Sequence, residues 1–139
     1  MCPNHYQGDR IGTMPLTLPQ WGQPGYLFNN MIDVECGEGD TAAWFSECFR
    51  EIIGIDSRDE CVIRATDQND LTNATFYNGR PDDLPATAES VQLVTLMHYN
   101  PAIDLPTFYA ECRRVLVPKG LEQLDFGGTS NDSFLQARD

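Results

Sequence analysis

The residues best suited to bind a ligand are two glycines in one loop and an acid further along the chain. The stretch "IDVECGEGDT" (residues 32–41) places Gly37 and Gly39 directly after a short apolar run. Asp56 ends a second apolar run, 17 residues after Gly39. Glycine adopts positive φ and lets a ligand approach the backbone. An acid at the end of the second apolar run can accept hydrogen bonds from both ribose hydroxyls. These residues predict a loop that binds a nucleoside-containing cofactor.

The elements that must position this loop follow the alternation of an α/β protein. Apolar runs predict strands, and amphipathic stretches between them predict helices. The predicted strands are 31–34, 51–56, 74–79, 90–97 and 121–128. Three helices are predicted: the first begins at Asp40, the second begins after Asp56, and the third spans 105–117. Phe45, Cys48 and Phe49 are predicted to share one stripe of the first helix. Alternation of this kind predicts a mostly parallel sheet, which binds ligands beyond the carboxyl ends of its strands.

Two cofactor classes are compatible with the loop. Gly37-x-Gly39-x-x-Ala42 fits the dinucleotide fingerprint, which would indicate an NAD-dependent oxidoreductase. However, Asp33, Glu35 and Glu38 lie in or beside the loop, where a doubly negative pyrophosphate would be repelled. S-adenosylmethionine has no phosphate and carries a sulfonium and an ammonium group, so the electrostatics favour this methyl donor.

Length, charge and cysteine content limit the remaining possibilities. A chain of 139 residues is long enough for one domain with a core. Its net charge of −12 disfavours binding to nucleic acids and to anionic membranes. No apolar run reaches the roughly 20 residues of a membrane span, and the first residues lack the apolar core of a signal peptide, so a cytoplasmic location is expected. Five cysteines without a CxxC pair indicate free thiols and no metal site.

The longer sequence context resembles class I S-adenosylmethionine-dependent methyltransferases. The resemblance rests on "IDVECGEGDTAAWFSECFREIIGIDSRDE" and "VTLMHYNPAIDLPTFYAECRRVLVPKG", and it covers roughly residues 30–126. The nearest group comprises small-molecule enzymes of the methyltransferase type 11 kind. This resemblance implies a three-layer Rossmann-like fold over residues 29–128, between an irregular arm (1–28) and a polar tail (129–139). It also implies S-adenosylmethionine as cofactor and a small-molecule methyl acceptor.

The resemblance assigns roles to individual positions. Asp33, Gly37 and Gly39 would line the methionine end of the cofactor, and Asp56 would bind the ribose. Ser57 would contribute beside Asp56, and the backbone around Arg80 and Pro81 would lie beside the adenine. Leu96 and His98 would face the transferred methyl group and the substrate, which makes His98 the candidate general base.

Two departures from the family pattern lead to an alternative function. The family loop reads D-x-G-x-G-x-G, and Glu35 replaces its first glycine. The family sheet has seven strands, whereas this chain ends near its fifth predicted strand. An uncovered fifth strand would expose a sheet edge to a second copy or another partner. The alternative is therefore a catalytically inactive methyltransferase-like domain that serves as a binding or scaffold protein.

Overall fold

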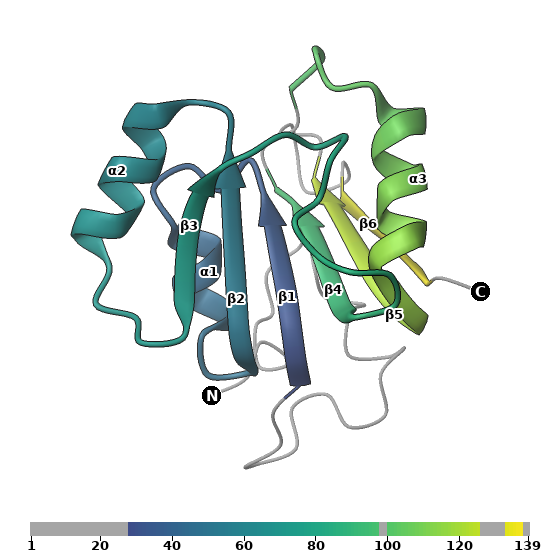
Figure 1. Ribbon diagram of the computed structural model, residues 1–139, viewed down its shortest axis with the longest axis horizontal. Coiled ribbons are helices and arrows are strands. Elements are labelled where there is room, and N and C mark those ends of the chain that lie inside the picture. Colours follow the sequence, from purple (N-terminus) through teal and green to yellow (C-terminus); the bar gives the residue numbers. More distant parts are fainter. Residues whose placement is uncertain (1–27, 98–99, 126–132, 138–139) are drawn as a thin grey trace.

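The computed structural model describes residues 28–97, 100–125 and 133–137, which form one sheet flanked by helices (Figure 1). The strands are β1 (Phe28–Val34), β2 (Phe49–Asp56), β3 (Ala74–Asn78), β4 (Val91–Leu96), β5 (Leu116–Asp125) and β6 (Ser133–Ala137). The helices are α1 (Asp40–Phe45), α2 (Asp59–Gln68) and α3 (Leu105–Val115). None of the helices within these ranges is long and apolar enough to cross a bilayer.

The sheet has the strand order β3-β2-β1-β4-β5-β6. Strands β1 to β5 run parallel and β6 runs antiparallel to β5. The chain moves outward from β1 to β2 and β3, then returns to place β4 on the other side of β1. The direction of winding therefore reverses between β1 and β4, which is where sheets of this kind form a ligand crevice.

Helices α1 and α2 pack on one face of the sheet and α3 packs on the other, which gives three layers (Figure 1). Successive side chains of a strand point to opposite faces. Accordingly, Met31 packs with Ala42 and Phe45 of α1, whereas the next residue, Ile32, belongs to the cluster that includes Phe108 of α3. The predicted fold class, a Rossmann-like α/β fold with a mostly parallel sheet, is confirmed.

Helix α1 is shorter than the sequence predicts. It ends at Phe45, and Phe49 begins β2 instead of continuing the helical stripe. The amide of Asn73 explains the early end, because it donates hydrogen bonds of 2.8 Å to the carbonyls of both Ser46 and Phe49. The ring of Phe49 lies 5.6 Å from that of Phe28 and 6.1 Å from that of Phe45. Phe49 therefore packs in the same core as predicted, but as a residue of a strand.

The C-terminal part also differs from the prediction. Helix α3 ends at Val115, and β5 begins at Leu116, so Pro118 and Gly120 lie inside a strand. Strand β6 lies within the segment predicted to be a polar tail, and it pairs with residues 121–125 of β5. The expectation that β5 forms an uncovered edge is therefore wrong. Antiparallel pairing is made by backbone groups, so a mixed sequence such as "SFLQA" can supply it without a clear apolar run.

Candidate functional site

The loop between β1 and α1 requires three residues with positive φ: Glu35 (56°), Gly37 (58°) and Gly39 (92°). A Cβ at Gly39 would lie 2.6 Å from the amide nitrogen of Asn69, which follows α2, and 3.0 Å from the ring of Phe76 in β3, so close contacts as well as the positive φ favour glycine there. A Cβ at Gly37 would meet nothing within 4 Å. Gly39 thus serves the turn itself, whereas Gly37 faces open space that a ligand could enter.

Asp56 ties this loop to the end of β2. The backbone N–H of Gly37 donates to Oδ2 of Asp56 at 2.9 Å. The guanidinium of Arg58 donates to Oδ1 at 3.0 Å and to Oδ2 at 3.1 Å, and its backbone N–H also reaches Oδ1 at 3.0 Å. Burial favours the neutral acid, but these hydrogen bonds outweigh it and hold the pKa of Asp56 below its ordinary value. Asp56 is an ionised carboxylate with no exposed surface.

Asp33 is a buried residue of β1 and lies beside Thr95 of the neighbouring strand β4. The hydroxyl of Thr95 donates to its Oδ1 at 2.7 Å, and its Oδ2 has no hydrogen-bond partner in the part of the chain that the structure describes. Burial raises the pKa of Asp33 to about 7, against the effect of the Thr95 hydrogen bond and with a smaller contribution from Asp56. A buried polar atom without a partner is costly, so a donor or cation that reached Oδ2 would be stabilised there.

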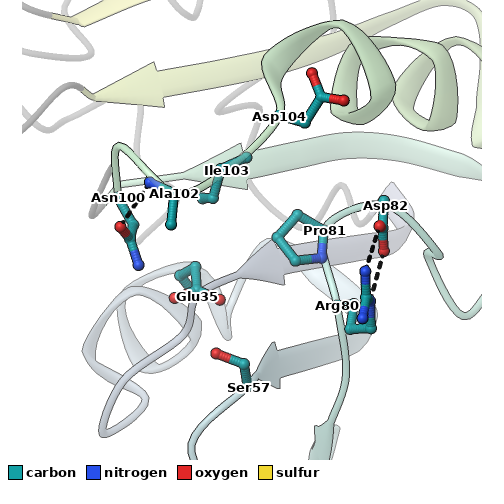
Figure 2. A pocket seen from close by; sticks show the side chains of 9 residues that line it. All are labelled: Glu35, Ser57, Arg80, Pro81, Asp82, Asn100, Ala102, Ile103 and Asp104. Atoms are coloured by element: carbon teal, nitrogen blue, oxygen red, sulfur yellow. Dashed lines mark hydrogen bonds and ion pairs between the residues drawn. The ribbon is translucent and has the colours of Figure 1, made fainter.

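A pocket of about 330 Å³ lies at the carboxyl ends of the strands (Figure 2). This volume is at the lower end of the range for small-molecule sites. The pocket is lined by Glu35 after β1, Ser57 after β2, Arg80, Pro81 and Asp82 after β3, and Asn100, Ala102, Ile103 and Asp104 between β4 and α3. Its wall therefore comes from the loops on both sides of the point where the winding reverses.

Glu35 projects into this pocket from the strained first position of the loop (Figure 2). Only 6% of its surface is exposed. Burial and the nearby charge of Asp56 raise the pKa of Glu35, while the charge of Arg58 and a hydrogen bond from the Ser57 backbone lower it. The side chain thus occupies space beside the end of β2 that a glycine would leave open.

The wall formed by residues 80–86 is held in place by α3. Arg114 donates to the carbonyl of Leu84 at 3.0 Å and to that of Ala86 at 2.9 Å. Glu111 accepts the N–H of Leu84 at 2.8 Å and is itself paired with Arg114 at 2.7 Å. Since Leu84 is buried, these bonds fix the segment that follows Arg80 in the pocket wall.

The structure brings most of the predicted residues to one edge of the sheet. Ser57, Arg80 and Pro81 line the pocket. The other predicted residues lie as follows: Gly37 and Asp56 are hydrogen-bonded beside it, Asp33 is buried next to Thr95, Gly39 packs against Asn69 and Phe76, and Leu96 is in the core below α3. His98 lies outside the described residues.

Sequence reasoning missed two contributors to the site. Arg58 pairs with Asp56, and no pattern in the sequence marks it. The segment from Asn100 to Asp104 completes the wall of the pocket. The rule that ligands lie beyond the carboxyl ends of strands could have indicated this segment, because it belongs to the connection between β4 and α3.

The fold and this site agree with comparisons to known proteins. Residues 31–120 match the model of a family described as a methyltransferase domain. This match spans the glycine loop, Asp56, the pocket wall and α3. The chain therefore belongs to the methyltransferase domain family, within which the resemblance noted above points to S-adenosylmethionine as the methyl donor. No match was found among curated proteins.

Solved structures share the same architecture. The YcgJ protein of Bacillus subtilis is 27% identical, with a TM-score of 0.67 over 82% of this chain and 48% of that chain. A complex of the Haloferax volcanii Trm112 methyltransferase activator with a methyltransferase gives 24% identity and a TM-score of 0.67, covering 83% of this chain and 51% of that one.

A third similar structure is phosphoethanolamine N-methyltransferase 1 of Haemonchus contortus, determined with phosphoethanolamine and S-adenosylhomocysteine. It is 18% identical and has a TM-score of 0.68 over 85% of this chain and 25% of that chain. The present chain spans about half the length of the first two structures and a quarter of the third.

Proposed function

We propose that this chain binds S-adenosylmethionine in the pocket beside Glu35 and transfers its methyl group to a small-molecule acceptor. The observation that carries the proposal is the connection between the loop and β2, in which the Gly37 N–H holds the Asp56 carboxylate at the strand end. Membership in the methyltransferase domain family supports the same cofactor.

The residues present fit this cofactor with one adjustment. The unpartnered Oδ2 of Asp33 is suited to a cationic group, and Gly37 leaves room at the loop. Asp56 stands at the position expected of a ribose-binding acid, but Arg58 occupies both of its oxygens. The Arg58 side chain is 55% exposed, so it can rotate into solvent and release Asp56 to the ribose hydroxyls. In this proposal Ser57, Arg80 and Pro81 form the wall beside the adenine.

The cofactor supplies an electrophilic methyl group when it is bound, and the protein's part is to position the acceptor and exclude water. Methyl transfer is an in-line displacement that depends on positioning and does not strictly need a base. The segment from Asn100 to Asp104 forms the wall that follows β4, where an acceptor would enter. His98 lies two residues before this segment in the chain, and its role as general base remains a prediction. The acceptor of the Haemonchus contortus relative, a small molecule, supports an acceptor of similar size.

A second function has specific support. A catalytically inactive domain that binds another protein would explain why Arg58 covers Asp56 and why Glu35 occupies the pocket. A carboxylate at the first glycine position reduces the space for a ligand and requires a strained backbone. This alternative predicts that the chain binds no adenosyl compound.

Thermal-shift and calorimetric titrations with S-adenosylmethionine, S-adenosylhomocysteine and NAD separate the candidates. Stabilisation by the two adenosyl compounds, and not by NAD, is the result that the proposal expects. Stabilisation by NAD alone would indicate the oxidoreductase. No response to any of the three would leave the inactive binding domain as the account of this chain.

A further inference from the structure

The turn after β2 binds two carboxylates, and one arginine lies close to both. Asp56 ends β2 and accepts hydrogen bonds from the backbone N–H of Arg58 at 3.0 Å and from its guanidinium at 3.0 and 3.1 Å. Glu35 accepts a hydrogen bond from the backbone N–H of Ser57, the residue between Asp56 and Arg58. The two carboxylates are thus held by consecutive backbone groups of the same turn.

The pairing of β1 with β2 brings Glu35 to this turn. The next residue, Cys36, donates its N–H to the carbonyl of Ile55 at 2.9 Å, so Glu35 leaves β1 beside the point at which Asp56 ends β2. The side chain of Glu35 lines the pocket, where Figure 2 shows it near Ser57. A guanidinium that moves from Asp56 towards the pocket would therefore meet the carboxylate of Glu35.

Arg58 acts on both acids, but unequally. Burial opposes the ionisation of each carboxylate. For Asp56 the hydrogen bonds from Arg58 outweigh burial, and the pKa lies below its ordinary value. For Glu35, burial and the charge of Asp56 raise the pKa, and the charge of Arg58 offsets them only in part. Glu35 is therefore the acid that would gain most from a closer guanidinium.

Binding of an adenosyl compound changes this balance. The ribose hydroxyls replace the hydrogen bonds that Arg58 makes to Asp56, but they carry no charge. Full release of Arg58 into solvent would leave two carboxylates close together in a partly buried site without a cation, which is unfavourable. We propose that Arg58 exchanges Asp56 for Glu35 when the ribose binds, so that Glu35 positions the released guanidinium. This inference rests on the proposed function, because it assumes that an adenosyl compound places its ribose at Asp56.

Both residues are suited to this exchange. The Arg58 side chain is 55% exposed and free to turn, and its planar guanidinium can pair with either carboxylate through two hydrogen bonds. Glu35 is fixed by the backbone of the loop, so its carboxylate is already in place. The exchange also accounts for an acid at the first glycine position. A Glu35 that is neutralised by Arg58 does not repel the carboxylate of S-adenosylmethionine, whereas an unpaired Glu35 would.

The test is a double-mutant cycle of Glu35→Gln and Arg58→Ala in the full chain, measured by isothermal titration at pH 8 and low ionic strength. The ligand is methylthioadenosine, a neutral thioether that keeps the adenine and the ribose, so no charge of the ligand acts on Glu35. When Arg58 is present, Glu35→Gln should raise the dissociation constant at least about threefold, because the released guanidinium loses its partner. In the Arg58→Ala background the same change should have no effect.

Glu38→Gln is the matched control. It removes a carboxylate from an exposed residue of the same loop outside the pocket wall, and it should leave the affinity unchanged in both backgrounds. The cycle with S-adenosylhomocysteine should give the same coupling between Glu35 and Arg58. If a ligand binds but Glu35→Gln has the same effect in both backgrounds, the inference is wrong and the proposed function stands. If neither compound binds to the wild-type chain, both are wrong.

A measurement on the wild-type chain does not depend on the folding of the variants. Nuclear Overhauser contacts between the side chains of Arg58 and Glu35 should appear when methylthioadenosine or S-adenosylhomocysteine is added, while those between Arg58 and Asp56 weaken. A complex in which Arg58 keeps its contacts with Asp56, or contacts neither acid, would overturn the inference.

Discussion

The guanidinium of Arg58 covers both carboxylate oxygens of Asp56, at 3.0 and 3.1 Å, and leaves Asp56 without exposed surface. A ribose that binds Asp56 must replace this contact. The backbone N–H groups of Gly37 and Arg58 hold the carboxylate in place independently of the guanidinium. The two backbone N–H groups thus hold the Asp56 carboxylate in position, while the Arg58 side chain, which covers its outer side, can move away.

Removal of the Arg58 side chain should strengthen cofactor binding. In Arg58→Ala the ribose no longer competes with the guanidinium, so the dissociation constant for S-adenosylhomocysteine should fall about three- to tenfold, a change of roughly 1 kcal/mol. Isothermal titration measures this directly. Arg64→Ala is the matched control, because Arg64 pairs with exposed Glu38 and should leave the affinity unchanged. Weaker binding in Arg58→Ala would mean that Arg58 takes part in holding the ligand.

The pH dependence of stability should report on Asp33. Its pKa is about 7 in the folded chain and 3.8 ordinarily, so the folded chain retains a proton that the unfolded chain releases between those values. The contribution of Asp33 to the unfolding free energy therefore falls as pH rises from about 4 to 7 and stays low above that range.

Asp33→Asn should remove this dependence, since an amide oxygen can still accept from Thr95. Relative to wild type, the variant should gain on the order of 3 kcal/mol of stability between pH 5 and pH 8. Urea unfolding at pH 5 and pH 8 measures the difference. If the two proteins differ by the same amount at both pH values, Asp33 is ionised throughout and this account of its burial is wrong.

Glu35 should destabilise the loop through its backbone conformation. Its φ of 56° is one that glycine adopts without strain, so Glu35→Gly should raise the free energy of unfolding by about 1 kcal/mol. Glu89 offers a matched control, because it has a φ of 53° and is exposed outside the pocket. Glu89→Gly should give a similar stability gain. A loss of stability in Glu35→Gly would show that its side-chain contacts outweigh the strain.

Arg114 should matter for the pocket although it does not line it. Arg114→Ala removes the donors to the carbonyls of Leu84 and Ala86, so the segment after Arg80 should become less ordered. We expect faster amide exchange at residues 82–86 and an affinity for S-adenosylhomocysteine reduced about threefold or more. Arg114→Lys keeps the charge but loses the planar fork, and it should restore only part of the protection. Unchanged exchange would show that the segment is fixed by other contacts.

Much of the fold follows from local sequence patterns. The apolar runs that end at Val34 and Asp56 and the alternation with helices were sufficient to predict a parallel sheet and the edge at which the site lies. Strand β6 was not predictable in this way, because its pairing with β5 depends on backbone groups and its sequence carries no strong pattern. The early end of α1 depends on the side chain of Asn73, 24 residues beyond Phe49, which no local pattern reveals.

The site shows the same division. The glycines and Asp56 were identifiable because each occupies a fixed place relative to a strand end. The residue types did not reveal that Arg58 covers Asp56, since a pairing two residues along the chain depends on the turn after β2. Nor could they show that Leu96 is directed into the core instead of the pocket, because this depends on which face of β4 it occupies.

The most direct test of the central claim is a titration of the ¹⁵N-labelled chain with S-adenosylmethionine, followed by amide chemical shifts. Binding in the proposed pocket predicts the largest shifts at Glu35, Gly37, Ser57 and Asp82. A second cavity, which is lined by Ser46, Arg50 and residues 70–73, should show no change and serves as the internal control. Absence of shifts at millimolar ligand, or shifts confined to residues away from the pocket, would contradict the claim that this chain binds the methyl donor there.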